Sequence, residues 1–178
     1  IASPASAAMA DPPAGTPAAP VTPPAPGPMH GRVYRDLEGS PIDLADAVGK
    51  PMVIELWATW CGPCRNQRIL MHRLSEEFTD VVFVAASTDE KGPQVVKDFK
   101  ASNPAENSTR SRVRDVMATP ELRAIIDRVK KENLIPQTIY VSRKGEIMDV
   151  AVGGQNEKFM RAVLKNMIRS KAPEAPAP

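Results

Sequence analysis

Two cysteines separated by two residues are the part of this chain best suited to covalent chemistry. Cys61 and Cys64 are the only cysteines among 178 residues. The apolar run 52–57 precedes them and predicts a buried strand, and apolar residues at helical spacing over 70–78 follow them. A helix N-terminus stabilises a thiolate through its dipole and its unpaired backbone N–H groups, which lowers the thiol pKa. The sequence therefore predicts a cysteine nucleophile at a strand–helix junction.

The spacing also suggests a division of roles between the two thiols. Cys61 would lie at the exposed end of the helical turn and attack the disulfide of a partner, and Cys64 would point inward and resolve the mixed disulfide. Gly62 permits close approach of another chain, and Pro63 suits the first turn of a helix because it has no N–H to lose. Half of a zinc site and a structural disulfide in a binding module are two other interpretations of such a pair.

The residues around the cysteines resemble a known family. Trp57 and Trp60 lie in the run 57–65, which is similar to the active site of thioredoxin-fold oxidoreductases. Four residues upstream extend the match to the TlpA/ResA branch of periplasmic thiol-disulfide proteins: Gly39, Leu44, Gly49 and Lys50. The resemblance covers roughly residues 32–169 and implies an α/β thioredoxin fold. In that fold a central mixed sheet is flanked by helices on both faces, with an N-terminal hairpin and an insertion before a cis-proline loop.

The resemblance also assigns a role to Glu55, which interrupts the apolar run six residues before Cys61. Glu55 matches the buried acid that thioredoxins place beneath the resolving cysteine, so it is expected to accept the proton of Cys64. Burial would raise the pKa of this carboxyl by desolvation. The lysine that thioredoxins pair with the acid is replaced by Ala85, which favours the protonated form further. A carboxylate at a sheet edge with a surface partner is the alternative interpretation.

A second part of the expected site lies far along the chain. Ile135 and Pro136 match the thioredoxin-fold loop in which the proline is cis and faces the cysteines, so that the Ile135 backbone can pair with an extended substrate. A trans proline that only ends a helix is the alternative. Gly153 matches a glycine that the family keeps near the substrate groove. The expected substrate-binding residues are Trp60, Gly62, Pro63, Ile135, Pro136 and Gly153.

A sheet and several helices must hold these residues. Strands are predicted where apolar or alternating residues run, and helices where apolar residues recur every three or four positions. The expected strands span 32–34, 42–44, 52–57, 81–86, 139–141 and 147–152. The expected helices span 65–78 and 93–99, with a third that begins at Thr119 and a last one that carries apolar residues over 159–168. The segment 101–119 is mostly polar and predicts a loop, unless 113–117 forms a strand.

Several positions on these helices carry expectations of their own. Val129 is expected to complete the buried stripe of the third helix, and Phe159 that of the last helix. His72 is expected on the surface of the helix that follows the cysteines. Where the family often has an acidic residue, this helix has Asn66 to Arg68, a more basic first turn that could change the choice of partner. Ile69 replaces a family proline and predicts a straighter helix.

Composition divides the chain into three parts. Residues 1–30 are rich in Ala and Pro and predict a disordered linker, residues 31–170 predict one thioredoxin-like domain, and residues 171–178 predict a disordered tail. The net charge is +2 with both signs dispersed, which argues against nucleic acid as a partner. The sequence has no run of 18 apolar residues, so no membrane span is expected.

A short motif near the N-terminus bears on location. Residues Ala8 to Ala10, followed by Asp11, resemble a signal-peptidase site with small residues at the required positions. Together with the family resemblance, the motif predicts an exported, periplasmic protein. A tether to the membrane through a segment upstream of Ile1 is left open.

The leading hypothesis is a periplasmic thiol-disulfide reductase that acts on disulfides of exported proteins. The resemblance implies apocytochrome c or the copper-site cysteines of a respiratory oxidase as substrates, and a membrane thiol carrier of the DsbD/CcdA kind as electron donor. The Gly-Pro dipeptide between the cysteines favours reducing power. We expect a monomer, no bound metal, and no cofactor beyond the redox-active disulfide between Cys61 and Cys64.

Two alternatives use the same residues. A disulfide oxidase or isomerase of the same fold would differ only in its reduction potential. A copper chaperone would bind metal through the two thiolates, but His30 and His72 are the only histidines and neither lies near the substrate loop in the sequence.

Overall fold

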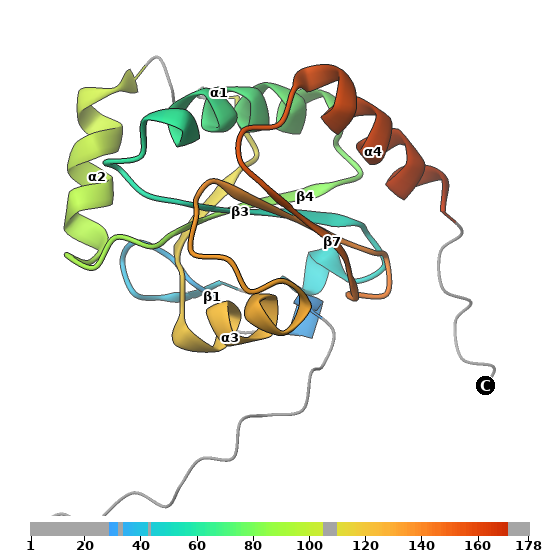
Figure 1. Cartoon of the computed structure of the whole chain (residues 1–178), viewed down its shortest axis with the longest axis horizontal. Coiled ribbons are helices and arrows are strands. Elements are labelled where there is room, and N and C mark those ends of the chain that lie inside the picture. The colour runs from blue at the N-terminus through green and yellow to red at the C-terminus, as the bar shows by residue number, and fades with distance from the viewer. Residues whose placement is uncertain (1–28, 32–33, 43, 105–109, 171–178) are drawn as a thin grey trace, which may run out of the picture.

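A five-stranded mixed sheet with helices on both faces forms the centre of the protein (Figure 1). The computed structural model describes residues 29–31, 34–42, 44–104 and 110–170. The strands of the sheet are β3 (Met52–Trp57), β4 (Val82–Ser87), β5 (Arg114–Met117), β6 (Gln137–Val141) and β7 (Ile147–Val152). The helices are α1 (Gly62–Glu77), α2 (Pro93–Ser102), α3 (Pro120–Val129) and α4 (Glu157–Arg169). The shorter elements are η1 (Met29–Gly31), β1 (Tyr34–Arg35), β2 (Pro41–Ile42) and η2 (Ala45–Ala47).

β3 is the central strand, in the order β5-β4-β3-β6-β7. It runs parallel to β4 and antiparallel to β6. All six of its residues are buried, which explains the near-continuous apolar run, because a strand covered on both faces has no solvent side. Its side chains alternate between the two layers of the core: Val53 packs with α1 and α4, whereas Ile54 packs with α3. Glu55 therefore shares the α1 side of the sheet with Val53.

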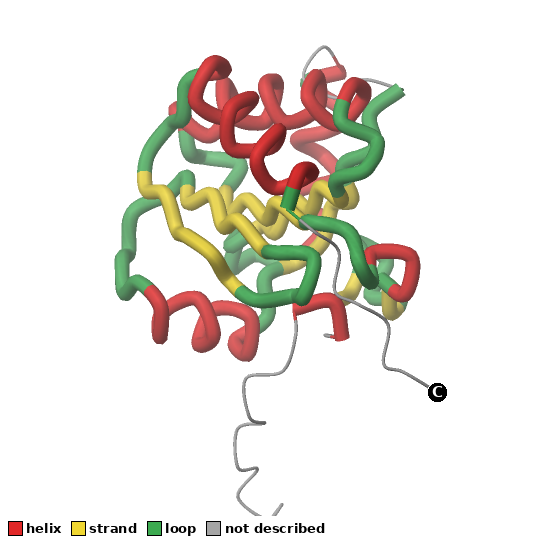
Figure 2. The backbone as a smooth tube through the Cα atoms, turned by 90° about the vertical axis from the view of Figure 1, so that its right-hand side faces the viewer, coloured by secondary structure: helices red, strands yellow, loops and turns green. Residues whose placement is uncertain are grey.

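The helices form one layer on each side of the sheet (Figure 2). α1 and α4 cover one face, where Leu74 and Met160 pack in the same apolar cluster. α3 and the N-terminal elements cover the other face, where Ile126 packs with Tyr34. β1 and β2 pair as the predicted antiparallel hairpin. Within the ranges given above, no helix is both long enough and apolar enough to cross a membrane.

The segment 101–119, predicted as a loop, contains a strand. β5 runs parallel to β4 at the edge of the sheet. Only Val116 among its four residues is buried, so the segment lacks the apolar pattern that marks the other strands. The alternative prediction of a strand over 113–117 is therefore confirmed. This segment is a strand because its backbone pairs with β4, and not because its side chains alternate. Residues 105–109 lie outside the described part of the chain.

The N-terminal boundary of the domain also differs from the prediction. Met29 and His30, which were assigned to the linker, form η1 and are buried. The backbone N–H of Met29 donates to the carbonyl oxygen of Gly145 at 2.7 Å, which attaches this turn to the β6–β7 hairpin. The remainder of the predicted linker, residues 1–28, and the predicted tail, residues 171–178, lie outside the described residues.

Two apolar side chains predicted to be buried are exposed. Val129 is the last residue of α3, and Phe159 lies in the first turn of α4. Both positions lie where the packed face of a helix ends. The start of α3 agrees with the prediction, because the hydroxyl of Thr119 accepts a hydrogen bond from the N–H of Leu122 and caps the helix.

Candidate active site

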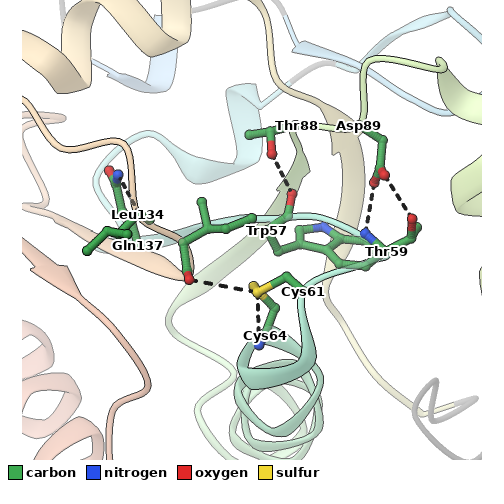
Figure 3. The surroundings of a disulfide bond; sticks show 9 residues. Trp57, Thr59, Cys61, Cys64, Thr88, Asp89, Leu134 and Gln137 are labelled. Carbon is green, nitrogen blue, oxygen red and sulfur yellow. Dashed lines mark hydrogen bonds between the residues drawn. A yellow bond between two sulfur atoms is a disulfide. The ribbon is translucent and has the colours of Figure 1, made fainter.

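The two cysteines form a disulfide at the N-terminus of α1 (Figure 3). Cys61 is the residue that caps the helix, and its Sγ accepts a hydrogen bond from the backbone N–H of Cys64 at 3.3 Å. Pro63 lies in the first turn, as expected from its lack of an N–H. Cys61 retains slight exposure and Cys64 has none. This difference agrees with a first thiol that meets the substrate and a second that resolves it.

The loop before β6 brings the distant part of the predicted site to the cysteines. The Ile135–Pro136 peptide bond is cis, as predicted. The Sγ of Cys61 lies 3.7 Å from the carbonyl oxygen of Ile135. The N–H of Gly153, at the end of β7, donates to the carbonyl oxygen of Pro136 at 2.8 Å. Three predicted substrate-binding residues, separated by up to 18 positions from one another, are therefore held together beside Cys61.

The disulfide is bordered by exposed residues. Trp60, immediately before Cys61, is 73% exposed, and Gly62 and Pro63 are also exposed. Leu134 is exposed as well, one residue before the Ile135 carbonyl. The sequence prediction missed Leu134, although an apolar residue beside the expected cis-proline loop was an available signal. These side chains form an apolar rim that a partner protein can cover.

A buried carboxylate fixes the loop that leads into α1. Asp89, just beyond β4, accepts hydrogen bonds from the N–H of Thr59 at 3.0 Å and from its hydroxyl at 2.8 Å. The hydroxyl of Ser87 donates to the same carboxylate at 2.7 Å. The backbone N–H of Thr88 donates to the carbonyl oxygen of Trp57 at 2.8 Å. The hydroxyl of Thr88 donates to the same oxygen at 3.1 Å (Figure 3). The sequence prediction assigned no role to Asp89, although its position at the carboxyl end of a strand next to β3 was a usable signal.

Glu55 is completely buried in the middle of β3. Within the described part of the chain, neither of its carboxylate oxygens has a hydrogen-bond partner. Desolvation raises the pKa of Glu55 to about 8; the Arg68 guanidinium opposes this rise and the Asp115 carboxylate adds to it. Because β3 is the central strand, the alternative of a carboxylate at the sheet edge is wrong.

The cation nearest to Glu55 belongs to α1 and not to β4. Ala85 pairs with Glu55 as expected, so β4 offers no lysine there. Arg68, predicted to belong to a basic first turn that meets partners, is instead 1% exposed. Its guanidinium lies 3.8 Å from the centre of the Trp57 ring and 3.1 Å from a carboxylate oxygen of Asp115. Arg68 follows Cys64 by one helical turn, so it shares the buried face of α1.

His72, predicted to be exposed, is also buried on this face of α1. Its Nδ1 lies 2.5 Å from the hydroxyl oxygen of Ser111, and its Nε2 lies 3.4 Å from the guanidinium of Arg68. The pKa of His72 is lowered to about 4, mainly by burial, and the Arg68 charge contributes in the same direction. The imidazole is therefore neutral at pH 7. No group of three or more potential metal ligands occurs among the residues that the structure describes.

Comparisons with known proteins agree with this geometry. The Redoxin family model matches residues 13–168. The chain is 29% identical to the thioredoxin-like protein YneN of Bacillus subtilis over 73% of this chain and 72% of that protein. It is 26% identical to the thiol-disulfide oxidoreductase ResA of Oceanobacillus iheyensis over 68% of this chain and 59% of that protein. A solved structure of a secreted Mycobacterium tuberculosis disulfide oxidoreductase homologous to E. coli DsbE has a similar fold, with a TM-score of 0.58, 16% identity, and coverage of 76% of this chain and 95% of that one.

Proposed function

The chain belongs to the Redoxin family and is a thiol-disulfide oxidoreductase with a thioredoxin fold, and from this premise we propose that it reduces disulfides in exported proteins. The observation that carries the proposal is the placement of the Cys61–Cys64 disulfide at the N-terminus of α1, beside the carbonyl oxygen of Ile135. A nucleophile and a backbone acceptor for an extended substrate are thus adjacent.

In the reducing direction, the reaction begins with the reduced cysteine pair. The Cys61 thiolate attacks one sulfur of the substrate disulfide, forms a mixed disulfide with it, and releases the other substrate sulfur as a thiolate. The N-terminus of α1 stabilises the Cys61 thiolate, because its N–H groups and dipole face that sulfur.

The second step uses Cys64 and Glu55. Cys64 gives its proton to the Glu55 carboxylate, attacks the Cys61 sulfur, and displaces the second substrate sulfur as a thiolate. The substrate gains two electrons, and the protein is left with the Cys61–Cys64 disulfide. When a donor reduces that disulfide again, protonated Glu55 returns the proton to the leaving Cys64 sulfur. A carboxyl with a pKa of about 8 carries a proton in most molecules at pH 7 and can still release it.

Substrate binding is assigned to the exposed rim and the cis-proline loop. An extended segment of the substrate would pair with the backbone of Ile135, while Trp60 and Leu134 cover its apolar side chains. Gly62 and Pro63 present little side chain between the cysteines, and Gly153 supports the loop through its bond to Pro136.

The finer parts of the proposal concern location and partners. The motif Ala8 to Ala10 and the secreted DsbE homologue support an extracytoplasmic protein, with the periplasm as its compartment. In that compartment we propose apocytochrome c or copper-site cysteines as substrates, and a membrane thiol carrier of the DsbD/CcdA kind as electron donor. We further propose a monomer that needs no cofactor beyond its own disulfide.

Cysteine substitutions test the division of roles. The change Cys61→Ser should abolish reduction of a protein disulfide such as that of insulin, because the attacking thiolate is lost. The change Cys64→Ser should instead accumulate a mixed disulfide on Cys61, visible as an adduct on a nonreducing gel. The Cys61→Ser, Cys64→Ser double variant is the control, and it should form no adduct. Retained activity in Cys61→Ser would contradict the assignment of the nucleophile.

The reduction potential of the cysteine pair separates a reductase from an oxidase or isomerase. It is measured by thiol trapping in glutathione or dithiothreitol buffers of known potential. A value near or below about −250 mV supports the reductase, since thioredoxin itself lies at about −270 mV. A value above about −180 mV would reverse the direction of electron flow and favour the alternative.

A further inference from the structure

Three strands place two carboxylates in one row beneath α1. Glu55 on β3 pairs with Ala85 on β4, and Ala85 pairs with Asp115 on β5. Paired residues of neighbouring strands point to the same face of a sheet, and neighbouring strands lie about 4.8 Å apart. The Cα atoms of Glu55 and Asp115 are therefore about 10 Å apart, with Ala85 between them on the same face of the sheet.

The side chain of Arg68 occupies this layer. Its guanidinium contacts the Trp57 ring on β3 and the Asp115 carboxylate on β5. It therefore lies over β4, where the small side chain of Ala85 leaves room for it. Lysine or any long side chain at position 85 would compete for the same volume. Trp57 lies two residues after Glu55 on the same strand, and hence on the same face of the sheet.

The other charged and titratable groups that face this layer are few. His72 on α1 is neutral at pH 7, as its lowered pKa requires. Lys100 on α2 forms an ion pair with Asp115 and is partly exposed. Cys64 packs in the same cluster as Trp57 and Ala85. On β6 the residue opposite Glu55 is the uncharged Thr138, and Tyr140 on the same face is kept neutral because burial raises the pKa of its hydroxyl. Arg68 is therefore the buried cation of this layer in the part of the chain that the structure describes.

We propose that Arg68 is a positioning residue: it is the cation that allows Glu55 to ionise near neutral pH, and Asp115 limits this effect by sharing the guanidinium. The inference rests on the proposed role of Glu55 as the proton acceptor of Cys64. Without Arg68, the completely buried Glu55 carboxylate and the mostly covered Asp115 carboxylate would face each other across Ala85, and such a pair resists a second ionisation. The signs of the two charge effects on the pKa of Glu55 agree with this arrangement.

The test follows the resolving step alone. One equivalent of dithiobis(nitrobenzoate) is mixed with the reduced protein, and released thionitrobenzoate is recorded by its absorbance. Cys61 releases the first equivalent and forms a mixed disulfide, and Cys64 releases the second as the protein disulfide closes. The rate of the second phase is measured from pH 5 to 10. In the native chain this rate should rise with pH around the pKa of Glu55, because only the carboxylate accepts a proton.

Substitutions of opposite expected sign make the test specific. In Arg68→Met the pH midpoint, at which the second phase reaches half of its maximal rate, should move up by one pH unit or more. This shift slows the second phase about tenfold at pH 7. In Asp115→Asn the midpoint should move down, because the negative charge of Asp115 no longer raises the pKa of Glu55 and no longer pairs with the guanidinium. Arg68→Lys should lie between the native chain and Arg68→Met. The matched control is Arg65→Met, which removes an exposed arginine three residues earlier on α1 and should leave the midpoint in place.

Failure of this inference is distinguishable from failure of the proposed function. A folded Arg68→Met with the native midpoint overturns the inference, and if that variant does not fold, an unchanged or raised midpoint in Asp115→Asn does so. Adding Arg68→Met to Glu55→Gln should change nothing further, since Arg68 acts through Glu55. A native profile in Glu55→Gln itself would remove the proton role of Glu55. In that case the pKa of Glu55, read by carboxyl ¹³C NMR, still tests Arg68: a rise in Arg68→Met supports the cation role, and no change overturns it.

Discussion

The polar residues buried under α1 differ in how they are stabilised. Glu55 lies in the middle of a strand without a hydrogen bond from the described residues, whereas Arg68 has an ion pair and an aromatic face. His72 is kept neutral and contacts the hydroxyl of Ser111. Burial of a charged or polar group is costly unless a partner compensates, so Glu55 and His72, whose pKa values are shifted by burial, make reactivity or stability depend on pH.

His72 should make the protein sensitive to acid. Its pKa is about 4 in the folded state against 6.5 for an unperturbed histidine, so below pH 6.5 the unfolded chain binds a proton that the folded protein resists. The stability that His72 contributes is complete above pH 6.5 and is lost as pH falls toward 4, by at most about 3 kcal/mol. In His72→Gln this part of the acid sensitivity should disappear, as measured by denaturant unfolding at pH 7.0, 5.5 and 4.5.

The relevant comparison is the change with pH and not the absolute stability, because the substitution also alters the contact with Ser111. His30 is buried with a lowered pKa as well, so His30→Gln serves as a matched histidine outside the active-site layer. If His72→Gln loses as much free energy between pH 7.0 and 4.5 as the native chain, the imidazole is not the acid-sensitive group.

At the scale of secondary-structure elements, the loop between β3 and α1 depends on β4. The short turn from Ala58 to Trp60 joins β3 to the cysteines. Asp89 holds this turn by accepting hydrogen bonds from the backbone N–H and the hydroxyl of Thr59. The N–H of Cys61 continues the turn by donating to the carbonyl oxygen of Ala58 at 3.1 Å. Asp89 thereby sets where Cys61 lies relative to the cis-proline loop.

Replacing this carboxylate should loosen the turn. In Asp89→Asn the three hydrogen bonds are no longer made to a charged acceptor. The NH₂ group of the new amide also replaces one accepting oxygen, so that it faces another hydrogen-bond donor. We expect a loss of about 1 to 3 kcal/mol in the free energy of unfolding. The change Asp98→Asn, on the exposed face of α2, is the control and should cost less than about 0.5 kcal/mol. Equal stability of the two variants in urea unfolding would show that the Asp89 bonds do not hold the turn.

At the scale of the whole molecule, the folded unit begins earlier than composition suggests. Met29 is 1% exposed and packs in the core cluster on the α3 side of the sheet. Its carbonyl oxygen accepts from the hydroxyl of Tyr34 at 3.1 Å, and its N–H bonds to Gly145. The first described turn therefore closes one end of the core.

Two deletions test this boundary. Removal of residues 1–26 should leave the melting temperature unchanged within about 1 °C, because their composition predicts no burial. Removal of residues 1–31 should cost about 2 kcal/mol or more, because it takes the buried Met29 out of the core. Both are measured by thermal unfolding of the oxidised protein. A shorter deletion that destabilises as much as the longer one would place part of residues 1–26 in the folded unit.

The sequence by itself determined the reactive centre and most of the framework. The cysteine spacing, the apolar run of β3, the proline of the cis loop and the cap at Thr119 are local signals, because each depends on a few neighbouring residues. The burial of Glu55 also follows from its place within that run. These features predicted the strand–helix junction, whereas the resemblance to thioredoxin-fold oxidoreductases implied the fold and the approach of Ile135 to the cysteines. The structure confirms all three.

Tertiary structure alone decided which polar residues of α1 are inside and whether β5 is a strand. Arg68 is buried because Asp115, 47 residues away, supplies an ion pair, and His72 because Ser111, 39 residues away, supplies a hydrogen bond. β5 is a strand because β4 pairs with it. A polar residue is buried, or a polar segment made a strand, only when a distant element compensates its groups, and no pattern within the segment records that partner.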